Sequence, residues 1–306
     1  FGALTALEEL TLYSDGGDYT DGFWLAGELS SMRSLRELCI ARATLRTLPV
    51  AVSALTALET LDIFCKRAVH CNLYACVNLN TIVIHGSDNV FTGLQGFSAV
   101  HSIDVQGQID GKLTAMPSLR QLTFEPFDDV TPEIGHLTSL HSLTIKECGR
   151  LPPTMSRLQS LRTLEISCDP DGEDRPILPK TLGSLTRLSS LRVDRIYHRL
   201  PRTLSQLTNL IVLRLSFNGH GGTLHFLTAL QSLRYLILEG RFHVDLPPLD
   251  LLLLLPNLTF MEINACYALP RGHQARHNLR ENHWLPDYAK ARRRFHQVYD
   301  PGSPGY

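Results

Sequence analysis

One short pattern, L-x-x-L-x-x-L-x-I, recurs along almost the whole chain and constrains its fold more than any other feature. Two of its copies stand 21 residues apart, starting at Leu137 and at Leu158. Twelve copies align at intervals of 19 to 28 residues, and they start at Leu4, Met32, Leu55, Cys76, Phe97, Met116, Leu137, Leu158, Leu185, Leu207, Leu230 and Leu255. Periodicity of this kind predicts a stack of repeats rather than one closed core.

Each copy contains a short alternation of polar and apolar residues. In the copy at Leu137 the alternation runs from Ser142 to Lys146, which is typical of a strand with one buried and one solvated face. One such strand and the two leucines before it cannot bury their apolar side chains alone, so the copies must stack on one another. We therefore predict an α/β solenoid, with a curved parallel sheet on its concave face and loops and short helices on its convex face.

A second motif, Leu-Pro followed by two residues and an apolar one, precedes several copies, at Leu48, Leu151, Leu178 and Leu200, and the Leu-Pro pair recurs at Leu246. Three residues beyond the last apolar strand position stand Cys148 and Cys266, and in one copy Asn218. With these motifs the chain, from Leu4 to about Ile263, resembles leucine-rich-repeat proteins. It resembles above all the repeat domain of plant intracellular nucleotide-binding disease-resistance proteins, and it is also similar to the plant Ras-group repeat scaffolds.

The first resemblance implies a ligand-sensing or autoinhibitory domain of an intracellular immune-receptor-like protein that acts in defence signalling. It also implies an upstream nucleotide-binding domain in the full-length chain. The alternative function is a stand-alone repeat scaffold, or the substrate adaptor of a ubiquitin ligase. The sequence starts inside a repeat, so we expect a fragment whose upstream sequence would separate the two functions.

We expect one repeat domain over residues 1–267 and a basic C-terminal segment over residues 268–306. Asp287 can N-cap a helix from about Tyr288 to Tyr299, whose apolar side chains would cover the last repeat. The segment carries seven Lys or Arg residues against three acidic ones. Its basic face suits an anionic partner, a contact with an acidic part of the same chain, or simple solvation.

Composition argues against several classes of function. A hydrophobic content of 43 % with a net charge of −1 indicates a folded protein with no general affinity for nucleic acid. No apolar run reaches the roughly 18 residues of a membrane-spanning helix. The seven cysteines are odd in number and lack a disulfide-framework spacing, which favours reduced thiols in a cytoplasmic or nuclear protein, and we expect the cytoplasm.

Three stretches contain residues typical of a metal site, a phosphate-binding loop or a catalytic site, but each lacks a residue or a spacing that such a site needs. The first is a group of metal-ligand residues without the paired spacing of a zinc site, namely Cys65, His70, Cys71 and Cys76. The loop from Gly107 to Lys112 is one residue short of a phosphate-binding loop, and the glycines at 221–222 have no nucleophile elbow to accompany them. We predict no catalytic residue, no metal and no cofactor.

The remaining candidate is the solvated side of the sheet. In each copy three outward residues flank the two buried strand positions, and stacking aligns them about 4.8 Å apart. Nine of these residues are acidic and three are basic: Glu9, Glu37, Asp62, Asp104, Glu125, Glu165, Asp194, Glu239 and Glu262, with Lys146, Arg192 and Arg214. Tyr235 and Phe260 are expected to be exposed there, and aromatic and arginine side chains are common anchors of interfaces.

We therefore predict a protein partner on the concave face, and the acidic columns suit a basic one. The predicted contact residues are Asp62, Phe64, Asp104, Glu125, Glu165, Arg192, Arg214, Tyr235, Ile237 and Phe260. An ordinary solvated sheet face is the alternative interpretation of the same residues.

Overall fold

The computed structural model describes residues 4–13, 29–43, 50–65, 69–70, 73, 75–92, 99–109, 116–126, 129–168, 178–218, 222–240, 244–245, 252 and 255–265. The chain forms two compact units, unit 1 over Phe1–Leu188 and unit 2 over Ser189–Tyr306. The predicted boundary between residues 267 and 268 and the predicted helix from Tyr288 lie outside the described residues.

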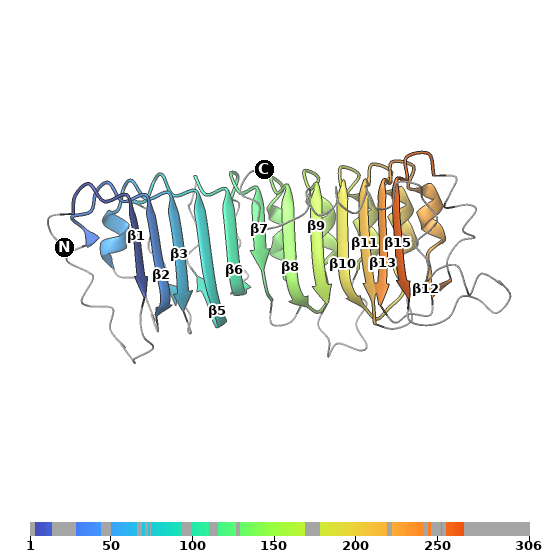
Figure 1. The fold of residues 1–306 in the computed structure, drawn as a ribbon, viewed down its shortest axis with the longest axis horizontal. Coiled ribbons are helices and arrows are strands. Elements are labelled where there is room, and N and C mark those ends of the chain that lie inside the picture. The colour runs from blue at the N-terminus through green and yellow to red at the C-terminus, as the bar shows by residue number, and fades with distance from the viewer. Residues whose placement is uncertain are drawn as a thin grey trace. The chain divides into compact units, whose positions relative to one another are not determined.

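Unit 1 is built on parallel strands that follow one another in chain order (Figure 1). They are β1 (Glu9–Tyr13), β2 (Glu37–Ala43), β3 (Thr60–Cys65), β5 (Thr81–Thr92), β6 (Ser102–Ile109), β7 (Gln121–Phe124), β8 (Ser142–Cys148) and β9 (Thr163–Cys168), and the short β4 (Val69–His70) pairs with β5.

Unit 2 repeats the arrangement with parallel strands β10 (Ser190–Ile196), β11 (Val212–Phe217), β13 (Tyr235–Gly240) and β15 (Phe260–Ala265). A separate pair, β12 (Gly222–Thr223) and β14 (Val244–Asp245), lies off this sheet. Each of these main-sheet strands, like those of unit 1, starts five residues after the predicted start of its copy, from Leu4 and Glu9 to Leu255 and Phe260. The predicted repeat register is therefore confirmed.

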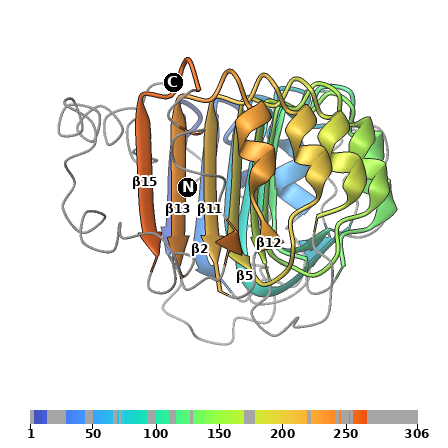
Figure 2. The same cartoon turned by 90° about the vertical axis from the view of Figure 1, so that its right-hand side faces the viewer.

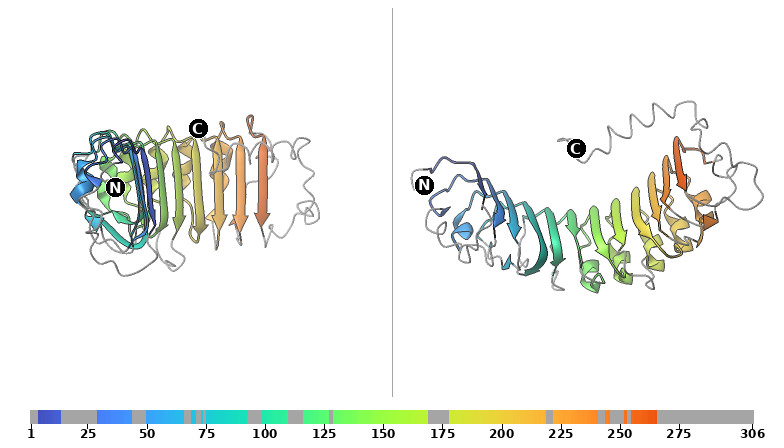
Figure 3. Two further views of the ribbon diagram at one scale, coloured as in Figure 1. Left: turned by 60° about the vertical axis from the view of Figure 1, so that its left-hand side comes forward. Right: turned by 60° about the horizontal axis from the view of Figure 1, so that its bottom comes forward.

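Short 3-10 helices follow the strands and lie on one side of each unit's sheet (Figure 2). Within each unit the strands line the inner side of the curve and these helices the outer side (Figure 3). The helices are η2 (Val50–Ala54), η3 (Pro132–His136), η4 (Pro153–Arg157) and η5 (Lys180–Ser184) in unit 1, and η6 (Arg202–Gln206) and η7 (His225–Ala229) in unit 2. The predicted fold class is confirmed.

The Leu-Pro motif marks where these helices begin. Pro152, Pro179 and Pro201 stand immediately before η4, η5 and η6, with φ between −74° and −67°. Proline fixes this angle and has no N–H to satisfy, so it suits the start of a helical turn. The apolar residue of the motif, such as Met155 in η4, is buried beneath the turn.

Stacking buries the consensus apolar residues in the interior copies. Leu137, Leu140, Leu143 and Ile145 are each at most 1 % exposed, as are their counterparts in the copy at Leu158. Burial is lower at the two ends of the described strands, where Leu4 is 41 % exposed and the side chains of β15 that face the core are half-buried. The core thus depends on a neighbour on both sides of each repeat.

Candidate functional site

The side of the sheet away from the 3-10 helices carries aligned columns of side chains, which we call the open face. Its central column in unit 1 consists of residues paired in register across neighbouring strands, namely Thr11, Cys39, Asp62, Val83, Asp104, Thr123, Thr144 and Glu165. Flanking columns contain the residues two positions before and two positions after each member. In β8, for example, Leu143 and Ile145 are buried while Ser142, Thr144 and Lys146 are half-exposed.

The open face of unit 1 is rich in carboxylates. Its acidic members are Glu9, Glu37, Asp62, Asp104, Glu125 and Glu165, and all are at least partly exposed. Among the open-face positions whose side chains are described in this unit, Lys146 alone holds a lysine or arginine. The structure thus brings Asp62, Asp104 and Glu165 into one column.

Few cations of the described open face offset these carboxylates. The Asp62 carboxylate lies 3.6 Å from the Nε2 of His85 on the next strand. One carboxylate oxygen of Asp104, Oδ1, is buried and has no hydrogen-bond partner in the described structure. Burial, helped by the neighbouring Glu147, raises the pKa of the Glu125 carboxyl, although the Lys146 ammonium opposes the rise. The electrostatic potential of this surface therefore favours a cationic partner.

Glu147 lies close enough to Glu125 to affect its pKa because of a β-bulge that the sequence analysis did not predict. It has a φ of 51°, and the register between β8 and β9 shifts between Ile145 and Cys148. A bulge accommodates an extra residue, so Cys148 turns inward and is 1 % exposed. The sequence signal for this bulge is the spacing of three residues between Ile145 and Cys148, which are both buried. Strict alternation along the strand would have placed the Cys148 side chain on the solvated face.

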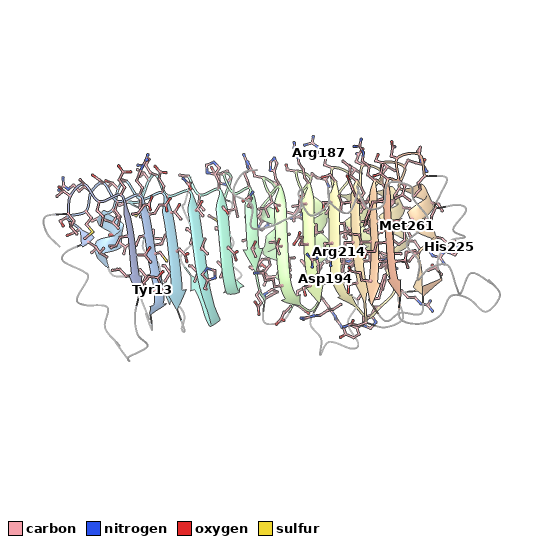
Figure 4. The ribbon with its side chains drawn as sticks, in the orientation of Figure 1. Tyr13, Arg187, Asp194, Arg214, His225 and Met261 are labelled. Atoms are coloured by element: carbon pink, nitrogen blue, oxygen red, sulfur yellow. The ribbon has the colours of Figure 1, made fainter. Side chains whose placement is uncertain are left out.

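The open face of unit 2 has a different character. Its central column runs Arg192, Arg214, Ile237 and Glu262, and a flanking column runs Ser190, Val212, Tyr235 and Phe260. The Arg192 Nε donates to Asp194 Oδ2 at 2.8 Å, and the Arg214 Nη2 donates to Glu239 Oε2 at 2.9 Å. Both arginines are therefore already paired with carboxylates of the same face, and Figure 4 labels Asp194 and Arg214 on the strands.

Two of the predicted contact residues are less accessible than expected. Ile237 is 2 % exposed and Phe260 is 1 % exposed, so the prediction that Phe260 is an exposed aromatic was wrong. The Arg214–Glu239 pair lies next to Ile237, because Arg214 is in register with Ile237 and Glu239 lies two residues further along the same strand. The ring of Phe260 packs against Tyr235, which is itself half-exposed, with centroids 6.3 Å apart.

Some predicted residues lie partly outside the described structure. The backbone of Phe64 is in register with His85 at the end of β3, but its side chain is not described. Of the suspected metal-ligand group, Cys76 has a described side chain, and it is a buried core thiol that donates to the Val52 carbonyl at 3.3 Å. Burial raises the pKa of this thiol to about 11.

The part of the chain that the structure describes holds no group of three or more His, Cys, Asp or Glu residues placed to bind a metal ion. Nor does any helix in that part have the length and hydrophobicity to cross a membrane. The aligned open-face columns are the feature from which a binding site can be built.

Comparisons with known proteins establish the fold. A scan of the sequence against models of protein families finds no match, and no curated protein matches it either. Among solved structures, an internalin (inlF) from Listeria monocytogenes matches with a TM-score of 0.58 and 17 % identity, over 79 % of this chain and 70 % of that one. A leucine-rich-repeat protein from Leptospira interrogans matches with a TM-score of 0.55 and 20 % identity, over 86 % and 74 %. The chain has the leucine-rich-repeat fold.

Proposed function

We propose that this chain is a non-enzymatic recognition module that binds a protein partner on the open face of its sheet. The observation that carries the proposal is the register of unit 1, which aligns partly exposed side chains into three columns. At about 4.8 Å per strand, the strands β1 to β9 offer a surface roughly 34 Å wide. A surface of that width suits a standard interface of about 800 Å² per partner.

The charge of unit 1 supports a basic partner. The carboxylates of Asp62, Asp104 and Glu165 share one column, and no arginine or lysine occupies the described part of it. Complementary charge across an interface accelerates encounter and excludes like-charged competitors.

Reversal of three open-face charges should separate binding from folding. We expect Asp104→Lys/Glu125→Lys/Glu165→Lys to weaken partner capture by about tenfold or more, because contacts between opposite charges become repulsive. The melting temperature should change little, because all three side chains are half-exposed. The measurement is a pull-down from lysate quantified by mass spectrometry, alongside a thermal melt.

The matched control for that experiment is Glu8→Lys/Glu133→Lys. Both residues reach solvent, but neither occupies an open-face position, since Glu8 precedes β1 and Glu133 lies in η3. The control protein should capture the same partner as the wild type. Loss of capture in the control, or equal loss of binding and melting temperature in the triple variant, would contradict the assignment of the open face.

Within this role, we infer a sensing or autoinhibitory domain of an immune-receptor-like protein. Support comes from the Leu-Pro motifs and from Cys148 at its consensus position, in which the sequence resembles plant nucleotide-binding receptors. The cysteines whose side chains the structure describes, Cys39, Cys76 and Cys148, are thiols, which favours a reducing compartment such as the cytoplasm. A phosphate-binding loop encoded upstream of Phe1 would support this role, whereas an F-box-like segment there would replace it with an adaptor function.

A further inference from the structure

A row of basic side chains lies along the edge of the unit 1 sheet at which the strands start. The residues immediately before β6, β7, β8 and β9 are His101, Arg120, His141 and Arg162. Within the row each main-chain N–H donates to the carbonyl of the residue one repeat earlier, at 2.8 Å for Arg120, His141 and Arg162. At about 4.8 Å per strand this ladder aligns the four residues over roughly 14 Å.

Three more basic residues lie next to this row. His136 and Arg157 are the last residues of η3 and η4, and the turn after η5 contributes Arg187. The Nε2 of Gln159 donates to the Ser184 carbonyl at 3.5 Å, which holds the turn after η5 beside the preceding repeat. Figure 4 labels Arg187 at the edge of the sheet where the strands start. We call the row of four and these three residues the turn edge; all seven are exposed or half-exposed.

The turn edge has no carboxylate of its own to offset its charge. The turns that form it contain no Asp or Glu, over residues 99–101, 116–120, 136–141, 157–162 and 184–188. The Arg120 Nη1 donates to two uncharged carbonyls, those of Pro117 at 3.0 Å and Ser139 at 3.3 Å. Neither Arg157 nor Arg187 forms an ion pair with a residue that the structure describes. The four arginines therefore give this edge a positive potential that attracts anions.

Carboxylates nearby limit the length and width of the basic surface. Earlier on the same edge, Arg36 and Glu59 stand before β2 and β3 and form an ion pair at 3.0 Å. On the open face Asp104 and Glu165 are the third residues of β6 and β9, roughly 10 Å from the edge. A broad polyanion, such as a nucleic-acid duplex or an anionic membrane, would meet these carboxylates as well. The turns also contain no Phe, Tyr or Trp on which unpaired bases could stack.

We propose that the turn edge binds an acidic segment of a protein partner. About five residues of extended chain span the same length as the row, and one chain is narrow enough to avoid the open-face carboxylates. A guanidinium matches a carboxylate through two parallel hydrogen bonds, so Arg120, Arg162 and Arg187 are the expected anchors. This surface is distinct from the open face and has the opposite charge, and its occupant does not require open-face recognition.

The test measures the fluorescence anisotropy of labelled nine-residue peptides. One peptide carries five consecutive glutamates between glycine and serine residues, and a second carries five glutamines instead. Single-stranded RNA and vesicles with an anionic lipid are competitors. The proteins are the wild type, Arg120→Gln/Arg162→Gln/Arg187→Gln and a control with the same change in net charge, Arg33→Gln/Arg199→Gln/Arg202→Gln, whose three arginines are exposed and lie outside the turn edge.

We expect the wild type and the control to bind the glutamate peptide about tenfold or more tightly than the glutamine peptide. The turn-edge variant should lose this preference and keep its melting temperature, because the three side chains are exposed. The open-face variant Asp104→Lys/Glu125→Lys/Glu165→Lys should bind the glutamate peptide at least as tightly as the wild type, since the peptide does not use the open face.

The proposal is overturned if the glutamine peptide binds as well as the glutamate peptide, if the turn-edge variant keeps the preference, or if the glutamate peptide does not bind. Loss of binding in the open-face variant would also overturn it. Tighter binding of RNA or of anionic vesicles through the same three arginines would assign the edge to another polyanion and overturn the proposal. None of these results affects the open-face function, which is tested separately by partner capture.

Discussion

Leu143→Ala is expected to lower the free energy of unfolding by about 2 to 5 kcal/mol. Leu143 is 0 % exposed in β8, in register with Leu122 on one side and Leu164 on the other. Truncation removes buried methyl groups and leaves a cavity that stacked repeats on both sides cannot close. Urea denaturation followed by circular dichroism measures the loss.

The matched control is Leu10→Ala, at the same consensus position of the first copy. Leu10 is only partly buried in β1, so its truncation removes less apolar contact, and we expect less than half the effect of Leu143→Ala. If Leu143→Ala is near neutral, or if Leu10→Ala costs as much, then the assigned repeat register is wrong.

Gly240→Ala is expected to destabilise the protein by roughly 2 to 6 kcal/mol, through backbone strain and steric overlap together. Gly240 has a φ of 105°, which L-residues rarely adopt. A Cβ atom at this position would lie 2.1 Å from the carbonyl oxygen of Phe217 on the neighbouring strand. Backbone has to move to relieve that overlap, because the opposing atom belongs to the main chain.

A second substitution separates the two causes. Gly240→Asn carries the same Cβ but tolerates positive φ better than alanine. We expect it to remain strongly destabilised, since the overlap with Phe217 persists. Thermal melts that place Gly240→Ala within about 1 °C of wild type would show that the backbone at the end of β13 does not approach Phe217 so closely.

The sequence predicts the strands of this fold well because the apolar side chains of every interior repeat are buried in the same way, by contact with the neighbouring repeats. Every interior copy buries the same positions against its neighbours, so periodicity alone is enough to assign residues such as Leu143 and Ile166 to their strands. The same reasoning places Asp104 and Glu165 in one column of the open face, since register fixes both faces of a strand at once.

Sequence pattern fails where a side chain's surroundings depend on particular neighbours. Ile237 occupies an outward position next to the Arg214–Glu239 ion pair, yet it is 2 % exposed. Glu147 reaches Glu125 through a bulge, which changes the direction of side chains without changing the repeat length. Accessibility and electrostatics of the site therefore required the three-dimensional arrangement.

The two open faces also differ in a way that total charge conceals. Unit 1 presents carboxylates with little cationic compensation among its described residues, whereas unit 2 pairs its arginines with Asp194 and Glu239 beside apolar residues. A net count over all outward positions gives only an acidic surface. The structure separates a surface rich in carboxylates from one whose arginines are ion-paired beside apolar residues.

The most direct test of open-face recognition is carboxyl footprinting of the wild-type protein with and without its captured partner. Carbodiimide-coupled labelling, read by mass spectrometry, reports the accessibility of each Asp and Glu. We predict that labelling of Asp104, Glu125 and Glu165 falls severalfold in the complex, while labelling of Glu8 and Glu133 is unchanged. Protection of Glu133 on the 3-10 helical side, with Asp104 and Glu165 still labelled, would contradict recognition through the open face.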